Sequence, residues 1–274
     1  MYQKKEWFND DPFWERFAPI MFDDAHWAEV PAVADGITRL AGLNLYPPLE
    51  ALPGVPRGNV SPEQSGPVRC LDLCCGFGRI ALELVRRGFS VTGVDITKSY
   101  LETAREDAAA EGLTAEFICE DVRSFNRPGV FDIAINLYNS FGYFEKPEDD
   151  ALLVQNAFES LKPGGVFFVE TLGKEIAVRD FVEGEWFRRA GFFVLTGYEV
   201  IDSWNALKYC WRLIPEAAGS AAIIEKTFVH RLYAASELRK LFLDAGFSSV
   251  EIFGDWDESP YDQRSPKLIV LGRK

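Results

Sequence analysis

The fold of this chain is decided at Val68-Arg-Cys-Leu-Asp-Leu-Cys-Cys-Gly-Phe-Gly-Arg79, where an apolar run enters a glycine-containing turn. Ile80 and Leu84 then begin a helical stripe. Gly76 and Gly78 allow the backbone to approach a ligand closely, because glycine has no side chain to clash. The first N–H groups of a helix lack partners within the helix and are free to bind an anion. The segment therefore predicts the first strand, turn and helix of a nucleotide-binding sheet.

Alternating strands and helices continue along the chain after this unit. Two further helices are expected to end at Gly112 and Gly246, and another begins at Pro147 with acidic residues in its first turn. This order predicts an α/β fold with a doubly wound, mostly parallel seven-stranded sheet that has helices on both faces. The seven predicted strands are 68–74, 90–94, 115–119, 131–137, 166–171, 249–253 and 267–272.

Three segments are expected to be added to this core. The N-terminal part has aromatic residues at helical spacing and predicts a helical segment, which serves either as packed core or as a lid over a ligand. Six prolines follow and predict a linker. Three β-favouring runs, 193–201, 207–213 and 222–232, predict a small antiparallel insertion on the substrate side. The predicted division is 1–45 (lid), 46–67 (linker), 68–173 with 234–274 (core), and 174–233 (insertion).

Composition excludes several classes of protein. The 274 residues carry 29 Lys and Arg against 42 Asp and Glu, a formal net charge of −13. Phosphate neutralisation needs clustered Lys and Arg, so we expect no nucleic-acid partner. No apolar run reaches the length of a membrane span and no signal-like stretch opens the chain, so we expect a soluble, cytoplasmic protein without a membrane partner. The five cysteines form no C-x-x-C pair, so we expect no metal site.

Acidic residues at the ends of the first three predicted strands help to distinguish between the cofactors that such a turn can bind. A Gly-x-Gly turn alone would serve a nicotinamide dinucleotide, a flavin or S-adenosylmethionine. Asp95 closes the second strand, where a carboxylate accepts hydrogen bonds from the ribose hydroxyls of any of these adenosine cofactors. Asp121 follows the third strand, within reach of an adenine amino group, and Asp72 precedes the glycines. Acidic neighbours suit a cationic sulfonium and disfavour a pyrophosphate.

These motifs together resemble the class I S-adenosylmethionine-dependent methyltransferases. The resemblance is close over roughly 68–172 and looser over 236–274. One departure is Cys74, which stands where the family usually has its first glycine; a subgroup with two cysteines before the glycine is similar. The five segments that resemble the family's motifs, in the family's order, are Leu71–Arg79, Gly93–Asp95, Glu120–Val122, Phe131–Leu137 and Leu161–Gly165.

The resemblance implies a Rossmann-like methyltransferase fold, S-adenosylmethionine as cofactor and S-adenosylhomocysteine as product. It also implies which positions contact the cofactor. These positions are Asp72, Cys74, Gly76, Gly78, Arg79, Asp95, Ile96, Asp121, Val122, Asn136 and Leu137.

The acceptor side is less clearly marked. Asn139-Ser-Phe-Gly-Tyr143 resembles the loop of small-molecule methyltransferases, including those that act on amino sugars. Tyr143 is a candidate catalytic residue or a packed loop aromatic, and His230 is a candidate base or a packed histidine. Arg231 is adjacent to His230 on a predicted strand, so only one of the two faces the pocket. The expected substrate contacts are Trp14, Phe17, Tyr138, Asn139, Tyr143 and Arg231.

The function that this resemblance implies is methyl transfer, by in-line displacement, to a nitrogen or oxygen atom of a small molecule. Two alternatives stay open at this point: an NAD(P)-dependent oxidoreductase on a similar sheet, and a non-catalytic module that only binds S-adenosylmethionine. The expected partner is a small-molecule acceptor, and the chain is expected to act as a monomer or a homodimer.

Overall fold

A computed structural model describes residues 6–43, 66–217 and 223–274 of the chain. The predicted linker, 46–67, lies outside the described residues except for its last two positions. Within the described ranges, no helix combines the length and the apolar character that crossing a membrane requires.

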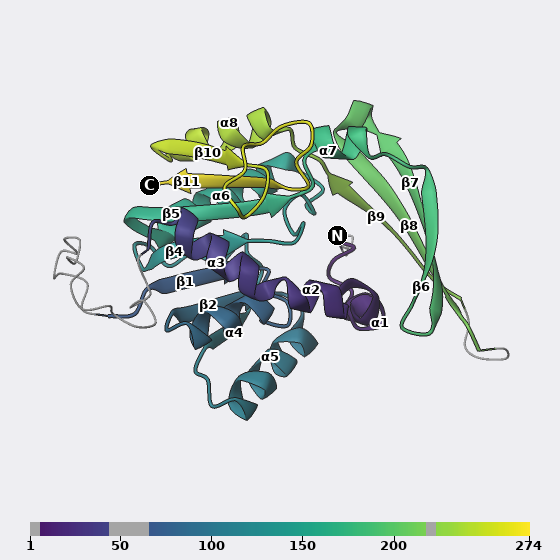
Figure 1. Ribbon diagram of the computed structural model, residues 1–274, viewed down its shortest axis with the longest axis horizontal. Coiled ribbons are helices and arrows are strands. Elements are labelled where there is room, and N and C mark those ends of the chain that lie inside the picture. The colour runs from purple at the N-terminus through teal and green to yellow at the C-terminus, as the bar shows by residue number, and fades with distance from the viewer. Residues whose placement is uncertain (1–5, 44–65, 218–222) are drawn as a thin grey trace, which may run out of the picture.

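A seven-stranded sheet forms the centre of the molecule (Figure 1). Its strand order is β10-β11-β5-β4-β1-β2-β3, and only β11 runs antiparallel to its neighbours. This confirms the predicted fold class, a mostly parallel doubly wound sheet. The strands are β1 Arg69–Leu73, β2 Ser90–Asp95, β3 Glu116–Cys119, β4 Phe131–Asn136, β5 Leu161–Thr171, β10 Ser249–Phe253 and β11 Leu268–Arg273.

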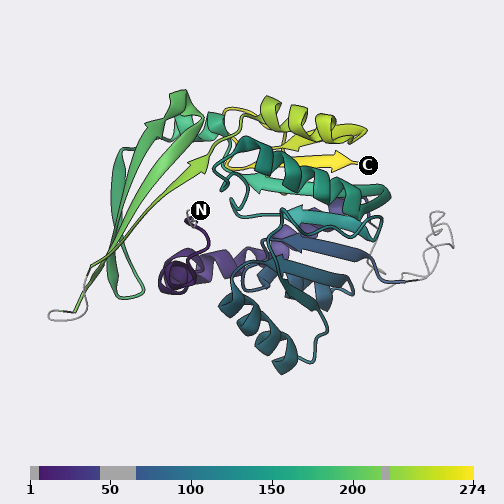
Figure 2. The ribbon, with the colours of Figure 1, turned by 180° about the vertical axis from the view of Figure 1, so that it is seen from behind.

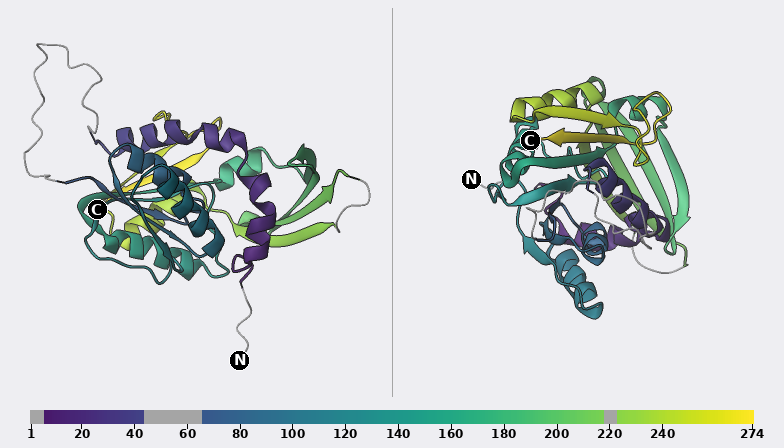
Figure 3. Two further views of the ribbon diagram at one scale, coloured as in Figure 1. Left: turned by 90° about the horizontal axis from the view of Figure 1, so that it is seen from below. Right: turned by 60° about the vertical axis from the view of Figure 1, so that its left-hand side comes forward.

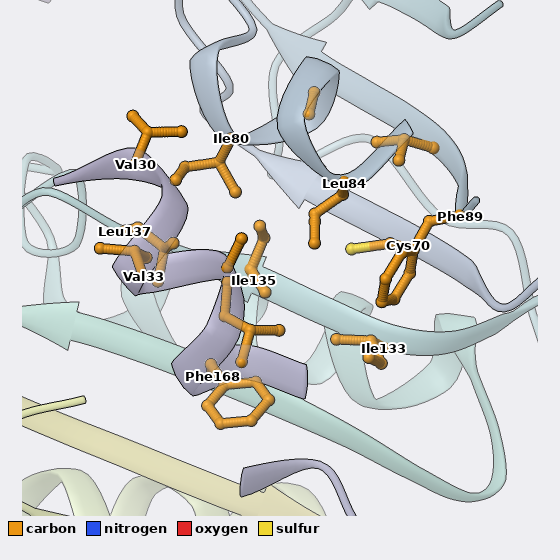
Figure 4. Close-up of a cluster of buried hydrophobic side chains, with 14 of the residues drawn as sticks. Val30, Val33, Cys70, Ile80, Leu84, Phe89, Ile133, Ile135, Leu137 and Phe168 are labelled. Atoms are coloured by element: carbon orange, nitrogen blue, oxygen red, sulfur yellow. The ribbon is translucent and has the colours of Figure 1, made fainter. Parts of the chain in front are cut away.

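Helices bury both faces of this sheet, which is why its central strands are rich in apolar residues. On one face α3 and α4 place Val30, Val33 and Ile80 against Ile133 and Ile135 of β4 (Figure 4). On the other face α6 and α8 cover a second cluster. The helices of the core are α3 Val30–Leu40, α4 Arg79–Arg86, α5 Lys98–Ala110, α6 Pro147–Ser160, α7 Lys174–Arg179 and α8 Ala235–Ala245.

A separate four-stranded antiparallel sheet extends from the core in the order β6-β7-β8-β9 (Figure 2). The predicted appendage is confirmed, but only three of its strands were expected. β6 is mostly exposed and lies at the edge of the sheet, so it lacks the apolar alternation that marks the other three. The strands are β6 Gly184–Arg189, β7 Phe192–Ile201, β8 Ala206–Pro215 and β9 Ile224–Arg231.

The N-terminal helices α1 (Asp11–Met21) and α2 (Asp24–Ala28) occupy the space between the two sheets (Figure 3). Phe13, Phe17 and Ile20 of α1 are buried against the antiparallel sheet. The opposite side of α1 reaches the core, where the Tyr100 hydroxyl donates a hydrogen bond to the Trp14 carbonyl at 2.7 Å. The helix therefore joins the two sheets and encloses the space between them.

Candidate functional site

A cavity of about 380 Å³ opens at the carboxyl ends of the adjacent parallel strands β1, β2, β3, β4 and β5. The turns after β1, β2, β3 and β4 form its floor, and α1 and the antiparallel sheet form its far wall. This is the position at which open α/β sheets bind ligands, beyond the carboxyl ends of the strands.

The turn after β1 is held in left-handed backbone conformations. Cys74 has φ 63°, Gly76 has φ 55° and Gly78 has φ 71°. Cys74 thus adopts a conformation that is uncommon for a residue with a side chain. Cys74 and Gly76 line the cavity. Gly78 does not: a Cβ on it would lie 3.0 Å from the ring of Phe117, so the glycine allows α4 to pack closely on β3.

Asp95 connects the end of β2 to this turn. Its Oδ2 accepts a hydrogen bond from the Gly76 N–H and its Oδ1 accepts one from the Thr97 N–H, both at 2.8 Å. Burial raises its pKa, and these N–H groups partly oppose that effect. Asp95 and the adjacent Ile96 both line the cavity. The carboxylate is therefore oriented in advance, with lone pairs left for ribose hydroxyls.

Asp72 is the most perturbed carboxyl group of the site. Its side chain is 4% exposed at the end of β1, and it lines the cavity. Burial, followed by the charge of Asp95, raises its pKa to about 8, against the opposing effect of Arg79. A cation placed in the cavity would relieve this cost. The acidic floor therefore fits a cofactor that carries positive charge.

Arg79 is buried at the start of α4 and lines the cavity. Its Nη1 donates to the His26 carbonyl at 2.6 Å, and its guanidinium lies over Tyr138 at 4.5 Å and Phe22 at 5.1 Å. Burial lowers its pKa. Arg79 thus ties α2 and its neighbours to the floor of the cavity.

Asp121 and Val122 line the cavity after β3. Arg123 binds Asp121 with Nη2 2.6 Å from Oδ2, and it also binds Glu6 at 2.6 Å and Asp149 at 3.1 Å. Burial alone would raise the pKa of Asp121, but the hydrogen bonds from Arg123 outweigh burial and lower it. Sequence reasoning missed Arg123, because two of its three partners, Glu6 and Asp149, come from distant segments.

The end of β4 contributes three cavity-lining residues, Leu137, Tyr138 and Asn139. Tyr138 and Asn139 have φ 56° and 62°, two consecutive left-handed residues without glycine. Asn136 does not line the cavity; it is fully buried and its Nδ2 donates to the Leu73 carbonyl at 2.9 Å. Asn136 thereby holds the ends of β1 and β4 together beneath the floor.

Of the two adjacent residues on β9, His230 faces the cavity and Arg231 does not. His230 Nε2 lies 2.7 Å from the Phe141 carbonyl. Because a carbonyl only accepts, Nε2 carries the proton and Nδ1 keeps its lone pair. Burial lowers the pKa of His230 to about 4, so the ring is neutral at pH 7. Arg231 instead donates to the Glu145 carbonyl at 2.9 Å.

Aromatic side chains form the far wall of the cavity. Trp14 and Tyr143 were expected there, and the ring of Tyr143 lies edge-on to His230 with centroids 5.3 Å apart. Burial raises the pKa of Tyr143, so its hydroxyl stays protonated. Phe17 does not line the cavity, because it is 1% exposed within the cluster behind it. Sequence reasoning missed Tyr209, Trp211, Phe228 and Arg189.

One signal in the sequence could have found two of these residues. Tyr209 and Trp211 are two apart on β8, so both point to the same face of the sheet. Nothing in the sequence shows that this face covers the cavity.

Comparison with known proteins agrees with this geometry. Residues 70–165 match the sequence model of a family described as methyltransferase domain. A protein assigned as a methyltransferase in Geobacillus sp. (strain WCH70) is 22% identical over 77% of this chain and 86% of its own length. The ubiquinone biosynthesis O-methyltransferase of Chelativorans sp. (strain BNC1) is 32% identical over 40% of this chain. The aligned part is 42% of that relative, less than half of its length.

Solved structures resemble this fold over nearly the whole length of the chain. The CcbJ methyltransferase from Streptomyces caelestis superposes with a TM-score of 0.75 at 18% identity, covering 99% of both chains. The sugar N-methyltransferase KedS8 from Streptoalloteichus sp ATCC 53650 gives a TM-score of 0.67 at 16% identity, covering 100% of this chain and 96% of that chain. At such identities the likeness concerns the fold.

The strand order and the position of the cavity give this chain the class I methyltransferase fold. Residues 70–165 match the methyltransferase domain family, and solved S-adenosylmethionine-dependent methyltransferases share the fold of the chain.

Proposed function

We propose that this enzyme transfers a methyl group to a nitrogen or oxygen atom of a small organic acceptor inside the cavity. The observation that carries the proposal is the continuity of that cavity. It runs from Asp72 and Asp95 at the strand ends to Tyr143 and His230 at the aromatic wall. Cofactor and acceptor can therefore meet in one enclosed space.

The acidic residues of the floor are proposed to hold the cofactor. Asp95 would accept hydrogen bonds from the ribose hydroxyls, Asp121 would meet the adenine amino group, and Asp72 would face the cationic amino-acid end. When bound, S-adenosylmethionine supplies a methyl group already activated by its sulfonium. The chain's own task is to place the acceptor in line with that methyl group and to exclude water.

The aromatic side of the cavity can orient the acceptor and exclude water. Well-oriented reactants lower a barrier by about 7–11 kcal/mol relative to a bimolecular encounter, so orientation can supply much of the catalysis. Tyr143 carries a protonated hydroxyl that can donate a hydrogen bond, and neutral His230 can accept one. The nucleophilic atom must lose a proton, and His230, which lines the cavity and keeps a lone pair on Nδ1, can accept it.

The names of the relatives support both acceptor atoms. One solved neighbour is a sugar N-methyltransferase, and several sequence relatives are ubiquinone biosynthesis O-methyltransferases. These activities belong to those proteins. For this chain they support a small-molecule acceptor. They do not distinguish a nitrogen from an oxygen as the methylated atom, which depends on the residues that line the cavity.

Calorimetric titration with S-adenosylhomocysteine tests the cofactor site. Gly76→Ala and Gly88→Ala form a matched pair, because both glycines have positive φ and only Gly76 lines the cavity. We expect Gly76→Ala to weaken binding at least tenfold and Gly88→Ala to leave it unchanged. Equal affinities for the two variants, or no binding to the parent protein at millimolar ligand, would refute the assignment.

Turnover is tested with S-adenosylmethionine labelled in its methyl group and a panel of small amines and phenols. We expect label to appear in an acceptor only when the enzyme is present. Tight cofactor binding with no transfer to any acceptor in the panel would instead favour a non-catalytic binding module. Binding of NADH, followed by its fluorescence, would favour an oxidoreductase.

A further inference from the structure

The acceptor end of the cavity is built from aromatic rings that are held by one another. We call Trp14, Tyr143, Tyr209, Trp211 and Phe228 the aromatic wall; they come from α1, the loop after β4, and strands β8 and β9. Two pairs within it are stacked, with centroids 4.9 Å apart at 3° for Tyr209–Phe228 and 6.2 Å apart at 29° for Trp14–Tyr143. Fixed rings favour a flat apolar ligand.

Charged groups of the cavity lie away from this wall or are already paired. The carboxylates line the floor, where the strands end. Arg189 borders the acceptor end, but its guanidinium is bound to Asp23 at 3.0 Å and to the Ile20 carbonyl at 2.8 Å. An ammonium group against the wall would lose its hydration without gaining a carboxylate. It would also approach the positive sulfonium, and like charges repel strongly in a dry site.

His230 provides a polar group that lines the cavity, and its hydrogen bond to the Phe141 carbonyl fixes which ring nitrogen carries the proton. Its Nε2–H is used by the Phe141 carbonyl, and Nδ1 has no hydrogen-bond partner among the described residues. A lone pair in this position accepts a hydrogen bond from a hydroxyl group. A hydroxyl also needs such an acceptor before it becomes nucleophilic enough to take a methyl group.

We propose that the acceptor is an uncharged aromatic compound bearing a hydroxyl group, with its ring against the aromatic wall and its hydroxyl donating to Nδ1 of His230. This inference rests on the proposed methyl transfer. In the reaction the acceptor oxygen forms the new O–CH₃ bond while the C–S bond breaks. The bonding pair stays on sulfur, and the hydroxyl proton moves to Nδ1 and then to solvent.

Binding to the protein saturated with S-adenosylhomocysteine tests the ring. The probes are 2-naphthol, which has the proposed features, and D-glucosamine, a charged amine without an aromatic ring. We expect 2-naphthol to bind at least tenfold more tightly than D-glucosamine. Equal affinities, or tighter binding of D-glucosamine, would overturn the inference while leaving the methyltransferase assignment intact. Failure of S-adenosylhomocysteine itself to bind would refute both the proposed methyl transfer and this inference.

Two variants locate the probe. Phe228→Leu keeps an apolar side chain but loses the ring, whereas Phe193→Leu does the same on the opposite face of the same sheet, away from this cavity. We expect only Phe228→Leu to weaken 2-naphthol, about tenfold, with the S-adenosylhomocysteine affinity unchanged in both. Equal effects of the two variants would place the probe elsewhere and refute the role of the wall.

A last comparison tests the hydroxyl contact. In the parent protein we expect 2-naphthol to bind about fivefold more tightly than naphthalene, as one hydrogen bond would provide. His230→Phe keeps a ring but removes Nδ1, and we expect it to bring this ratio close to one. A preference that survives in His230→Phe would show that His230 does not hold the hydroxyl.

Discussion

The charge of Asp72 is expected to lower the stability of the free protein and to strengthen binding of the cofactor. Its carboxyl group is buried beside Asp95, which raises its pKa from 3.8 to about 8. Asp72→Asn keeps the shape of the side chain, but it cannot ionise. The variant therefore separates the charge of Asp72 from its packing.

The size and sign of the effect follow from the raised pKa. Between about pH 4 and pH 8 the folded chain keeps the proton that the unfolded chain has lost, so the free energy of unfolding falls as pH rises. A difference of about 4 pKa units corresponds to on the order of 5 kcal/mol once the pH exceeds 8. Well below pH 4 Asp72 is protonated in both the folded and the unfolded chain, so the parent protein and Asp72→Asn should have similar stability.

Urea unfolding of the free protein at pH 5 and pH 9 measures this effect. We expect Asp72→Asn to be more stable than the parent protein at pH 9, and its advantage to be on the order of 4 kcal/mol larger there than at pH 5. An advantage that does not change between the two pH values would refute the reasoning.

Cofactor binding should change in the opposite direction. S-adenosylhomocysteine brings a cationic amino group, so at pH 9 we expect Asp72→Asn to bind it at least tenfold more weakly. Asp132→Asn is the control, because Asp132 lies near the amino end of β4, where it binds Lys162 at 2.7 Å. Its affinity for S-adenosylhomocysteine should equal that of the parent protein, and a loss in both variants would point to a nonspecific effect of charge.

Three further changes have expected outcomes. Asp95→Ala removes the acceptor for the Gly76 N–H, and calorimetry should show S-adenosylhomocysteine binding weakened at least tenfold; retained affinity would contradict the ribose role. Gly142→Ala forces a Cβ into the Arg231 carbonyl at φ 98°, and urea unfolding should show a loss of about 2–3 kcal/mol. Tyr233→Phe removes the 2.8 Å hydrogen bond to buried Asp150 and should cost about 1–3 kcal/mol in the same assay, whereas unchanged stability would exclude that bond.

The core was predictable because buried parallel strands have a simple pattern. β1, β2, β4 and β5 are buried at most positions and rich in apolar residues, and glycines and acidic residues mark where strands and helices end. β6 was not predicted because it is an exposed edge strand and lacks the alternation of apolar and polar residues that marks a half-buried strand. The pairing of β11 between β10 and β5 is likewise a property of the assembled sheet.

Prediction of the candidate site was uneven for a related reason. Residues that follow a strand, such as Asp95 and Asp121, can be placed at the cavity from their position in the chain. Phe17 and Trp14 belong to one aromatic helix, yet only Trp14 reaches the cavity. Packing across the molecule decides which face of α1 contacts which sheet. The helical spacing of the aromatic residues does not carry that information.

The sequence by itself determined the α/β core, the cofactor motifs and their order, because each depends on local periodicity or on residues a few positions apart. It also determined that only one of His230 and Arg231 could face the pocket. The tertiary structure decided that His230 does so, that Asp72 is buried beside Asp95, and that an antiparallel sheet supplies the aromatic wall. Burial and mutual distance set these properties, and both arise only when segments far apart in the chain pack together.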